Sequence, residues 1–380
     1  MASEQRVLLL GGGKIGRMIA QLLSSTGDYA LCVADRDPAA LARLALAVPG
    51  ITTSQVDVAD PAALRRALSE VDIVVSALSY YHNPQVARAA LAAGASYFDL
   101  TEDVRTTREV RAIAEQAGPG QVFMPQCGLA PGFVSVLAHD LTRHFDKLDS
   151  IHMRVGALPQ FPSNDLKYNL TWSTDGLINE YCNPCEAIVD GDTREVLPLE
   201  GLEHFSLDGV RYEAFNTSGG LGTLCETLRG KLRELDYKTI RYLGHRELAS
   251  FLVRGLRLSE RRELLKDILE YAIPITFQDV VIVFCTASGF RRGQLVQVSD
   301  ARKIYSHLLH GENWSAIQIT TAAGICTMID LFREGGLPHA GFVRQEEVPL
   351  PVFLQNRFGR HYESRSASRF AFGDDNPQEP

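Results

Sequence analysis

Short apolar runs alternate with amphipathic stretches along the first third of the chain. The apolar runs fall at residues 6–10, 29–34, 52–57, 73–77, 97–100 and 121–124. The helical patterns between them fall at residues 15–23, 38–47, 61–69, 86–92 and 104–117. Strands that alternate with helices of this length predict βαβ units. We therefore expect an α/β fold with a doubly wound parallel sheet of the Rossmann type over residues 1–130.

The pattern changes after Gly128. Pro131 and Gly132 mark a turn, a helix is expected at residues 133–144, and the connections become longer. Strands are expected at 151–155, 211–214 and 280–285, with a largely solvated amphipathic helix at 260–271. This predicts a second, mixed α/β domain over residues 131–311. An apolar helix at 312–332 belongs to the segment 312–360, and the polar tail 361–380 is expected to be disordered.

Composition and charge narrow the function classes. The 380 residues are 45% hydrophobic and 22% charged with a net charge of −8, which is typical of a globular protein. That balance argues against nucleic acid or a membrane surface as the main partner. No apolar run is long enough to span a bilayer, and the N-terminus lacks a signal-peptide pattern, so a cytoplasmic location is expected.

The seven cysteines predict neither a disulfide framework nor a metal site. Their number is odd and they are scattered along the chain. Cys182 and Cys185 form one isolated CxxC pair, without a second cysteine or histidine pair at zinc-like spacing. We interpret this pair as structural.

A glycine-rich turn follows the first predicted strand. Gly11, Gly13 and Gly16, with Lys14 and Ile15 between them, fit the GxGxxG pattern. In such a turn the first glycine permits a tight bend, the second lets the backbone approach a pyrophosphate, and the third allows close helix–strand packing. The start of the helix presents free N–H groups to the phosphates. The context of strand, turn and helix predicts a dinucleotide site rather than a bare turn.

Further candidate cofactor residues lie at the ends of the next strands. Asp35 stands where a carboxylate accepts hydrogen bonds from a ribose, which favours NAD; the adjacent Arg36 keeps NADP possible, because an arginine can hold the extra phosphate. The ends of the third and fourth strands supply candidates that flank the adenine and the nicotinamide ribose, with plain strand ends as the alternative. These candidates are Asp57, Val58, Ser76, Ala77 and Leu78.

Several segments together resemble the saccharopine dehydrogenase family, and within it the lysine 6-dehydrogenase-like members. Besides residues 7–16 and 76–100, they are YFDLTED at 97–103, CGLAPG at 127–132, KYNLTWS at 167–173, LINEY at 177–181, EAFNTSGG at 213–220 and DYKTIRYLGH at 236–245. Ala130 occupies a position where saccharopine reductases typically carry an acid, and the chain is shorter than theirs. Both departures favour the lysine 6-dehydrogenase side.

The resemblance implies both an architecture and an activity. It implies a Rossmann domain, an inserted mixed α/β domain for substrate binding and dimerisation, and a late helix that returns to the Rossmann domain, in a homodimer. It also implies an NAD(P)-dependent amino-acid dehydrogenase that acts on a C–N bond. Oxidative deamination of the L-lysine side-chain amine is the first expectation, and saccharopine oxidoreduction is the alternative. A protein that binds NAD(P) only as a redox sensor is the rival from another class.

Amine oxidation by NAD sets simple chemical requirements. The amine must lose a proton before hydride leaves its carbon, because an ammonium has no lone pair to push. An amino-acid substrate also brings an α-carboxylate, which a planar guanidinium binds in a bidentate way. Arg241 is our candidate for that carboxylate, and His245 is our candidate proton acceptor. A surface salt bridge and a structural histidine are the respective alternatives.

The remaining candidates are polar residues near the expected pocket. Asp99 ends the fifth predicted strand and is expected to hold an ammonium or steer a proton, or else to cap a turn. Lys167 and Tyr168 lie in a segment expected to contact substrate. At least one of three consecutive residues after the fourth strand is expected to face the pocket: Tyr80, Tyr81 and His82.

Overall fold

The computed structural model describes residues 4–338 and 340–363. Its parallel sheet holds seven strands in the order β17-β6-β5-β4-β1-β2-β3. The strands are β1 (Gln5–Leu10), β2 (Tyr29–Asp35), β3 (Thr52–Gln55), β4 (Ile73–Ser76), β5 (Ser96–Asp99), β6 (Val122–Met124) and β17 (Gly341–Phe342). The order reverses between β1 and β4, which is the point where doubly wound sheets bind ligands.

Five helices connect these strands, each close to its expected place: α1 (Lys14–Ser24), α2 (Pro38–Ala47), α3 (Pro61–Ala67), α4 (Asn83–Ala93) and α5 (Val104–Ala114). Asp37, Asp60 and Asp103 accept backbone N–H groups at the starts of α2, α3 and α5, which explains why these helices begin where they do. The α/β prediction with an N-terminal Rossmann domain is therefore confirmed.

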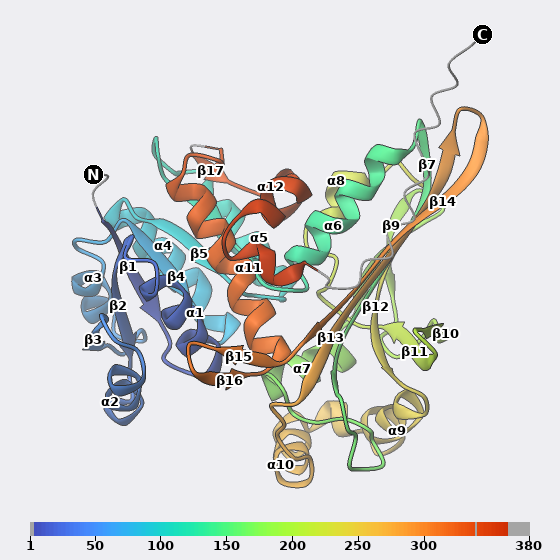
Figure 1. The fold of residues 1–380 in the computed structure, drawn as a ribbon, viewed down its shortest axis with the longest axis horizontal. Helices are drawn as coiled ribbons and strands as arrows, with labels where there is room; N and C mark the ends of the chain where they lie inside the picture. The colour runs from blue at the N-terminus through green and yellow to red at the C-terminus, as the bar shows by residue number, and fades with distance from the viewer. Residues whose placement is uncertain (1–3, 339, 364–380) are drawn as a thin grey trace.

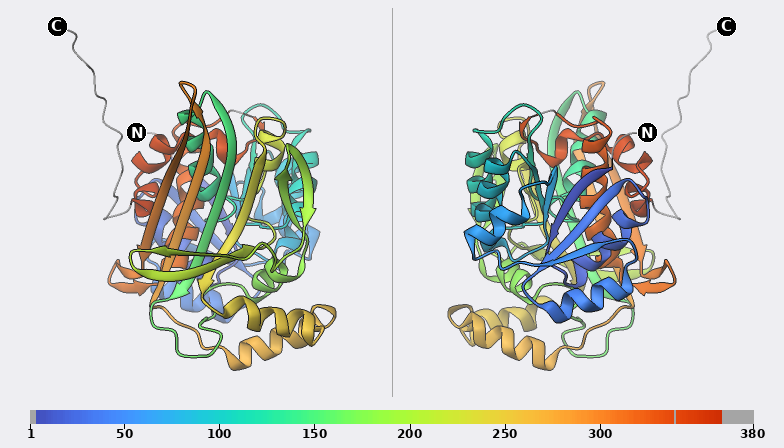
Figure 2. Two further views of the ribbon diagram at one scale, coloured as in Figure 1. Left: turned by 90° about the vertical axis from the view of Figure 1, so that its right-hand side faces the viewer. Right: turned by 90° about the vertical axis from the view of Figure 1, so that its left-hand side faces the viewer.

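A second sheet of eight strands faces the first domain (Figures 1 and 2). Its main path runs β10-β11-β12-β7-β13-β14, with β8 paired to β12 and to β9. The strands are β7 (Lys147–Pro159), β8 (Cys185–Val189), β9 (Asp192–Val196), β10 (Glu203–Leu207), β11 (Val210–Asn216), β12 (Glu234–Tyr242), β13 (Asp279–Arg291) and β14 (Gln294–Tyr305). A separate hairpin pairs β15 (His307–Leu309) with β16 (Glu312–Trp314).

The helices of this half lie between the sheets and at one end of the second sheet (Figure 1). They are α6 (Phe133–Leu141), α7 (Thr174–Cys182), α8 (Leu224–Leu228), α9 (His245–Ser250), α10 (Arg262–Ala272), α11 (Ala316–Arg333) and α12 (Leu350–Gln355). Shorter helical turns are η1 (Tyr80–His82), η2 (Thr142–His144), η3 (Phe251–Gly255), η4 (Leu258–Glu260), η5 (Gln345–Glu347) and η6 (Gly359–Tyr362).

The structure corrects three expectations for the second half. The strand predictions captured only parts of β7 and β13, which with β14 form long antiparallel pairs. No helix was expected at α7. The late helix begins at Ala316 rather than at 312, because Ser315 and Gln318 form a capping box and the preceding residues pair as β16.

The predicted disordered tail lies mostly outside the described residues. Within the described part of the chain, no helix is both long and apolar enough to cross a membrane.

One apolar core joins the two sheets. It includes Leu9 of β1, Val136 of α6, Val281 of β13 and Ile319 of α11, all at most 1% exposed. α11 packs beside α1, and Gln318 donates from Nε2 to the carbonyl of Lys14 at 3.4 Å. The carboxyl ends of the parallel strands are thereby held next to the second sheet.

Candidate active site

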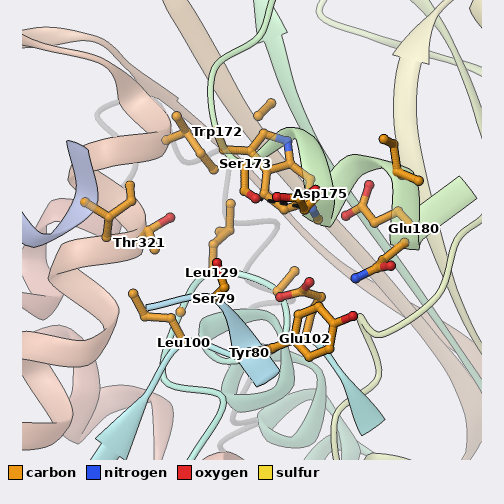
Figure 3. Close-up of a pocket in the computed structure, with 18 of the residues that line it drawn as sticks. Ser79, Tyr80, Leu100, Glu102, Leu129, Trp172, Ser173, Asp175, Glu180 and Thr321 are labelled. Carbon is orange, nitrogen blue, oxygen red and sulfur yellow. Dashed lines mark hydrogen bonds between the residues drawn. The ribbon is translucent and has the colours of Figure 1, made fainter. Parts of the chain in front are cut away.

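A cavity of about 490 Å³ lies where the two halves meet, beyond the carboxyl ends of β4 and β5. The loops after these strands line one side, and α7 and β12 line the other. In Figure 3, Ser79 and Tyr80 lie opposite Trp172 and Asp175, while Thr321 of α11 closes one end. Tyr80 and Tyr81 both line this cavity, as the sequence led us to expect of at least one residue in this turn.

The glycine-rich turn opens beside this cavity and has the shape that a dinucleotide needs. Gly11 has a φ of +101°, and a Cβ there would lie 2.8 Å from a backbone oxygen of the neighbouring strand end. A Cβ on Gly16 would lie 1.9 Å from the Gly11 carbonyl oxygen. Gly13 caps α1 without a side-chain hydrogen bond, and nothing lies within 4 Å of its Cβ position. The start of α1 is thus open beside Gly13, so the residues present fit a pyrophosphate.

Asp35 lies at the end of β2, where a ribose would sit. Its carboxylate accepts hydrogen bonds from the backbone N–H groups of Gly12 at 2.8 Å and Asp37 at 2.9 Å. Two bonds leave further lone pairs on a carboxylate that is only partly buried. Arg36 beside it is exposed. Both side chains therefore remain available to the adenosine half of a dinucleotide.

The other candidate cofactor residues take different positions. Ile15, Ala77 and Leu78 line the cavity, and Lys14 is exposed at the start of α1. Three candidates serve local structure, so for them the plain strand-end alternative accounts for the contacts seen. Asp57 accepts the N–H of Ala59, Val58 packs in the core, and Ser76 donates to Asn83 Oδ1 at 2.7 Å.

Arg241 of β12 is a buried cation that lines the cavity. Its guanidinium carbon lies 4.8 Å from the ring centre of Tyr168 and 5.8 Å from that of Tyr181. Nε donates to the Tyr181 hydroxyl and Nη1 to the Ile240 carbonyl, both at 2.9 Å. Nη2 makes no hydrogen bond to the part of the chain that the structure describes, although Glu180 Oε2 lies 3.8 Å away.

His245 lies behind Arg241 rather than in the cavity. Its Nδ1 is 2.7 Å from the Leu166 carbonyl oxygen, so Nδ1 carries the proton, and Nε2 accepts from the Tyr181 hydroxyl at 2.9 Å. Burial, and then the Arg241 charge, lower the pKa of His245 to about 3. A neutral histidine thus orients Tyr181, which in turn orients Arg241.

The three other candidate substrate contacts also lie outside the cavity lining. Asp99 is fully buried and accepts hydrogen bonds from Tyr97 Oη and from the N–H groups of Thr101 and Gln126. These hydrogen bonds connect the end of β5 to the loop that follows β6. Lys167 is exposed and donates to the Leu243 carbonyl at 2.8 Å. Tyr168 is buried beneath Arg241, and its hydroxyl accepts from the Trp172 indole at 3.1 Å.

Glu102 and Glu180 line the cavity and were missed as site residues. Their carboxyl groups point into it from opposite sides (Figure 3). Burial raises the pKa of each carboxyl to about 7. The Arg241 charge opposes this rise at Glu180, whereas the Glu102 carboxylate adds to it. Both residues stand in segments that support the family resemblance, and Glu180 follows apolar Leu177 and Ile178 on a mostly buried helix. An acid on such a helix was the available signal.

The cavity mouth is bordered by α10, which contacts α7 through polar pairs. Lys266 Nζ lies 2.8 Å from Asp175 Oδ2. Arg262 donates to the side-chain oxygens of Asn179 and Asn183 at 3.0 and 2.7 Å. Arg262, Glu263 and Lys266 all line the cavity. Both cations at the cavity mouth therefore already have protein partners, whereas Nη2 of Arg241 makes no hydrogen bond to the described residues.

Cysteine and metal chemistry find no support in the described residues. Cys182 and Cys185 are free thiols, and burial raises the pKa of each. No group of three or more His, Cys, Asp and Glu side chains between residues 4 and 338 or 340 and 363 is arranged to hold a metal ion.

Comparison with known proteins follows the same division of the chain. Residues 7–123 match the saccharopine dehydrogenase NADP-binding domain, and residues 128–356 match the saccharopine dehydrogenase C-terminal domain. NAD(P) binding, predicted from the glycine turn, is therefore confirmed at the level of the domain. The choice between NAD and NADP is not.

The curated relatives share less than a third of their residues with this chain and are longer than it. The chain is 29% identical over 312 residues to the NADP(+)-dependent, L-glutamate-forming saccharopine dehydrogenase of Saccharomyces cerevisiae, covering 78% of this chain and 67% of that one. It is 21% identical to the mitochondrial alpha-aminoadipic semialdehyde synthase of Mus musculus, covering 96% of this chain and 38% of that one. The chain thus spans well under half the length of that mouse relative.

A solved structure shares the fold. The apo saccharopine dehydrogenase (L-Glu forming) of Saccharomyces cerevisiae superposes with a TM-score of 0.75 at 19% identity, covering 92% of this chain and 96% of that one. The homologues are NAD(P)-dependent oxidoreductases that act on CH–NH groups, which confirms the predicted enzyme class. The two domain matches together extend from residue 7 to residue 356, and the chain belongs to the saccharopine dehydrogenase family.

Proposed function

We propose that this protein oxidises the side-chain amine of L-lysine with NAD(P). The observation that carries the proposal is Arg241, whose buried guanidinium keeps Nη2 free of hydrogen bonds to the described residues at the cavity wall. An α-carboxylate is the natural ligand for that group. The charged cavity residues are otherwise acidic in balance, with Glu102, Asp175, Glu180 and Glu263 against Arg262 and Lys266. This balance suits a substrate with two amines and one carboxylate.

The residues would divide the work as follows. The dinucleotide supplies the acceptor for the hydride that leaves the carbon bearing the nitrogen. Arg241 holds the carboxylate end, and the cavity wall fixes the chain between its two ends. Glu102 lies between Thr321 and Glu180 in Figure 3, and this position supports Glu102 as the group that accepts a proton from the reacting amine. Water then converts the imine to an aldehyde and releases ammonia, and the aldehyde can cyclise on the α-amine.

Saccharopine is the second candidate, and two observations favour it. The curated yeast relative carries that activity in its name. Arg262 and Lys266 also line the cavity, and saccharopine has three carboxylates to satisfy. The contacts of these two cations argue against saccharopine, because both already pair with side chains of the protein. Their partners are Asn179, Asn183 and Asp175. A non-catalytic redox sensor would have no use for a charged cavity beside the dinucleotide turn.

Absorbance of the reduced nicotinamide, followed at alkaline pH, tests the proposal. L-lysine and saccharopine are supplied separately, each with NAD and with NADP. We expect turnover on L-lysine, and a roughly 10- to 100-fold lower kcat/KM for Arg241→Ala, as expected when a charged hydrogen-bond partner is lost. Arg241→Lys should recover only part of this, because an ammonium cannot bind in a bidentate way.

Arg229→Ala is the matched control, since this exposed arginine of the second domain lies 3.8 Å from Asp192. Turnover on saccharopine alone would replace lysine by the second candidate. Tight dinucleotide binding without turnover on either compound would support the sensor.

A further inference from the structure

We propose that Arg241 and Glu180 together bind an intact α-amino-acid head group, so that the nitrogen that reacts is a different one on the substrate's side chain. The inference deepens the proposed function and rests on it. It assigns Glu180 to the α-ammonium, beside the α-carboxylate on Arg241. The pair would then determine which class of amine enters the site.

The geometry leaves one polar atom open on each partner. Glu180 Oε2 is buried and has no hydrogen-bond partner in the described part of the chain. It lies 3.8 Å from Arg241 Nη2, which is too far for a hydrogen bond. The aromatic rings and two hydrogen bonds hold Arg241 in place, so the guanidinium is not drawn toward the carboxylate. A ligand that offers both charges would satisfy both atoms.

The chemistry of the head group matches this arrangement. In an α-amino acid, one carbon separates the carboxylate from the ammonium, so the two charges need neighbouring partners of opposite sign. A simple structural ion pair would instead be expected to close to hydrogen-bond distance, because an unpaired buried oxygen costs about 1–3 kcal/mol. An ammonium at Glu180 would also offset the repulsion between this carboxylate and that of Glu102.

The cavity leaves room for the reaction at its other end. In Figure 3, Glu102 and Tyr80 lie between Glu180 and Thr321. Ile15, within the glycine-rich turn, and Ala77, after β4, also line the cavity. A head group held at Glu180 therefore directs the side chain past Glu102 toward the dinucleotide. An α-amine bound by Glu180 would be kept away from the hydride acceptor.

Binding of unreactive ligands tests the inference without turnover. L-norleucine carries the α-amino-acid head but no side-chain amine, and hexanoate lacks the α-amine as well. Calorimetric titration of each into the full chain saturated with NADPH or NADH measures the dissociation constants. We expect Glu180→Gln to weaken L-norleucine about 10- to 100-fold and to change hexanoate less than about twofold. Glu195→Gln, an exposed glutamate of β9, is the control.

A second variant and a second substrate pair complete the test. Glu180→Asp should retain part of the preference for L-norleucine, and thermal unfolding reports whether each variant is folded. With active enzyme, Glu180→Gln should raise KM for L-lysine but not for 6-aminohexanoate. Equal weakening of both ligands by Glu180→Gln, no weakening of either, or no binding of L-norleucine to the unmodified protein would overturn the inference. Absence of lysine turnover with the expected binding pattern would overturn only the proposed function.

Discussion

Arg241 owes its orientation to neutral neighbours. The Leu166 carbonyl accepts from His245, His245 accepts from Tyr181, and Tyr181 accepts from Arg241. In this series of hydrogen bonds, each donor has one acceptor, so the guanidinium has one favoured position. Sequence spacing placed His245 near Arg241 and suggested a proton acceptor. The structure does not favour this role, because an imidazole that is 2% exposed next to a guanidinium does not readily take up a proton.

The pH dependence of stability should show this buried histidine. In the unfolded chain a histidine takes up a proton near pH 6.5, whereas folded His245 does so only near pH 3. Its contribution is therefore present above pH 6.5 and is lost as the pH falls toward 3. We expect His245→Asn to remove up to about 1.4 kcal/mol per pH unit from the slope of unfolding free energy between pH 6 and 4, measured by urea denaturation.

His204→Asn is the matched control, because His204 is an exposed histidine of β10 in the same sheet. It should leave the acid-side slope as it is in the unmodified protein. Equal slopes for His245→Asn and the unmodified protein would show that His245 is protonated when folded.

At the level of elements, α11 is anchored by a residue from the second sheet. Asp279 begins β13 and is fully buried. Its carboxylate accepts the N–H groups of Ala316 at 2.5 Å and Ile317 at 3.1 Å. Ile317 in turn lines the cavity, and Gln318 contacts the start of α1. A capping carboxylate thus links the second sheet to the dinucleotide turn.

Loss of this cap should destabilise the fold measurably. Asp279→Ala leaves two buried N–H groups without an acceptor, for which we expect a loss of about 2–4 kcal/mol in the free energy of unfolding. Chemical denaturation measures the difference. Asp60→Ala removes a cap from the exposed start of α3 and should cost clearly less. Similar losses for the two variants would mean that the N–H groups of α11 find other partners.

Elements with a local signal were predictable, and those without one were not. The helices α1 to α5 carry apolar spacing and flanking turns within a few residues, and α2, α3 and α5 also begin at capping aspartates. In contrast, β13 is long because it pairs along its length with β7, which lies far earlier in the chain, and β14 follows it as the second strand of a hairpin. Ser173 caps the start of α7 by accepting the Gly176 N–H with its hydroxyl, but this helix is nine residues long and carries a weak apolar pattern. Tertiary pairing overrides local preference in such segments.

At the scale of the whole molecule, one of the clusters of buried apolar side chains extends across both sheets. Residues of β1, α6, β13 and α11 belong to the same cluster of buried apolar side chains. Separation of the two sheets would expose this shared cluster to water, so we expect the two sheets to unfold together.

Thermal unfolding should therefore follow a single transition. We expect far-UV circular dichroism and tryptophan fluorescence to give the same midpoint. The fluorescence comes from Trp172 at the cavity and Trp314 in β16, and Trp314→Phe isolates the cavity signal. Saturating dinucleotide at 100 times its Kd should add about 2.7 kcal/mol and shift both signals equally. Two separate midpoints, or a shift in only one signal, would show that the halves unfold independently.

The sequence by itself determined the parallel sheet, the glycine-rich turn, the acid at the end of β2 and the family, because each of these depends on residues close together in the chain. It also selected Arg241. Only the tertiary structure decided what surrounds Arg241. Sixty residues separate this arginine from Tyr181, and Glu102 and Glu180 meet at the cavity from different domains. Burial and opposing charges at such distances arise from packing, which local patterns do not encode.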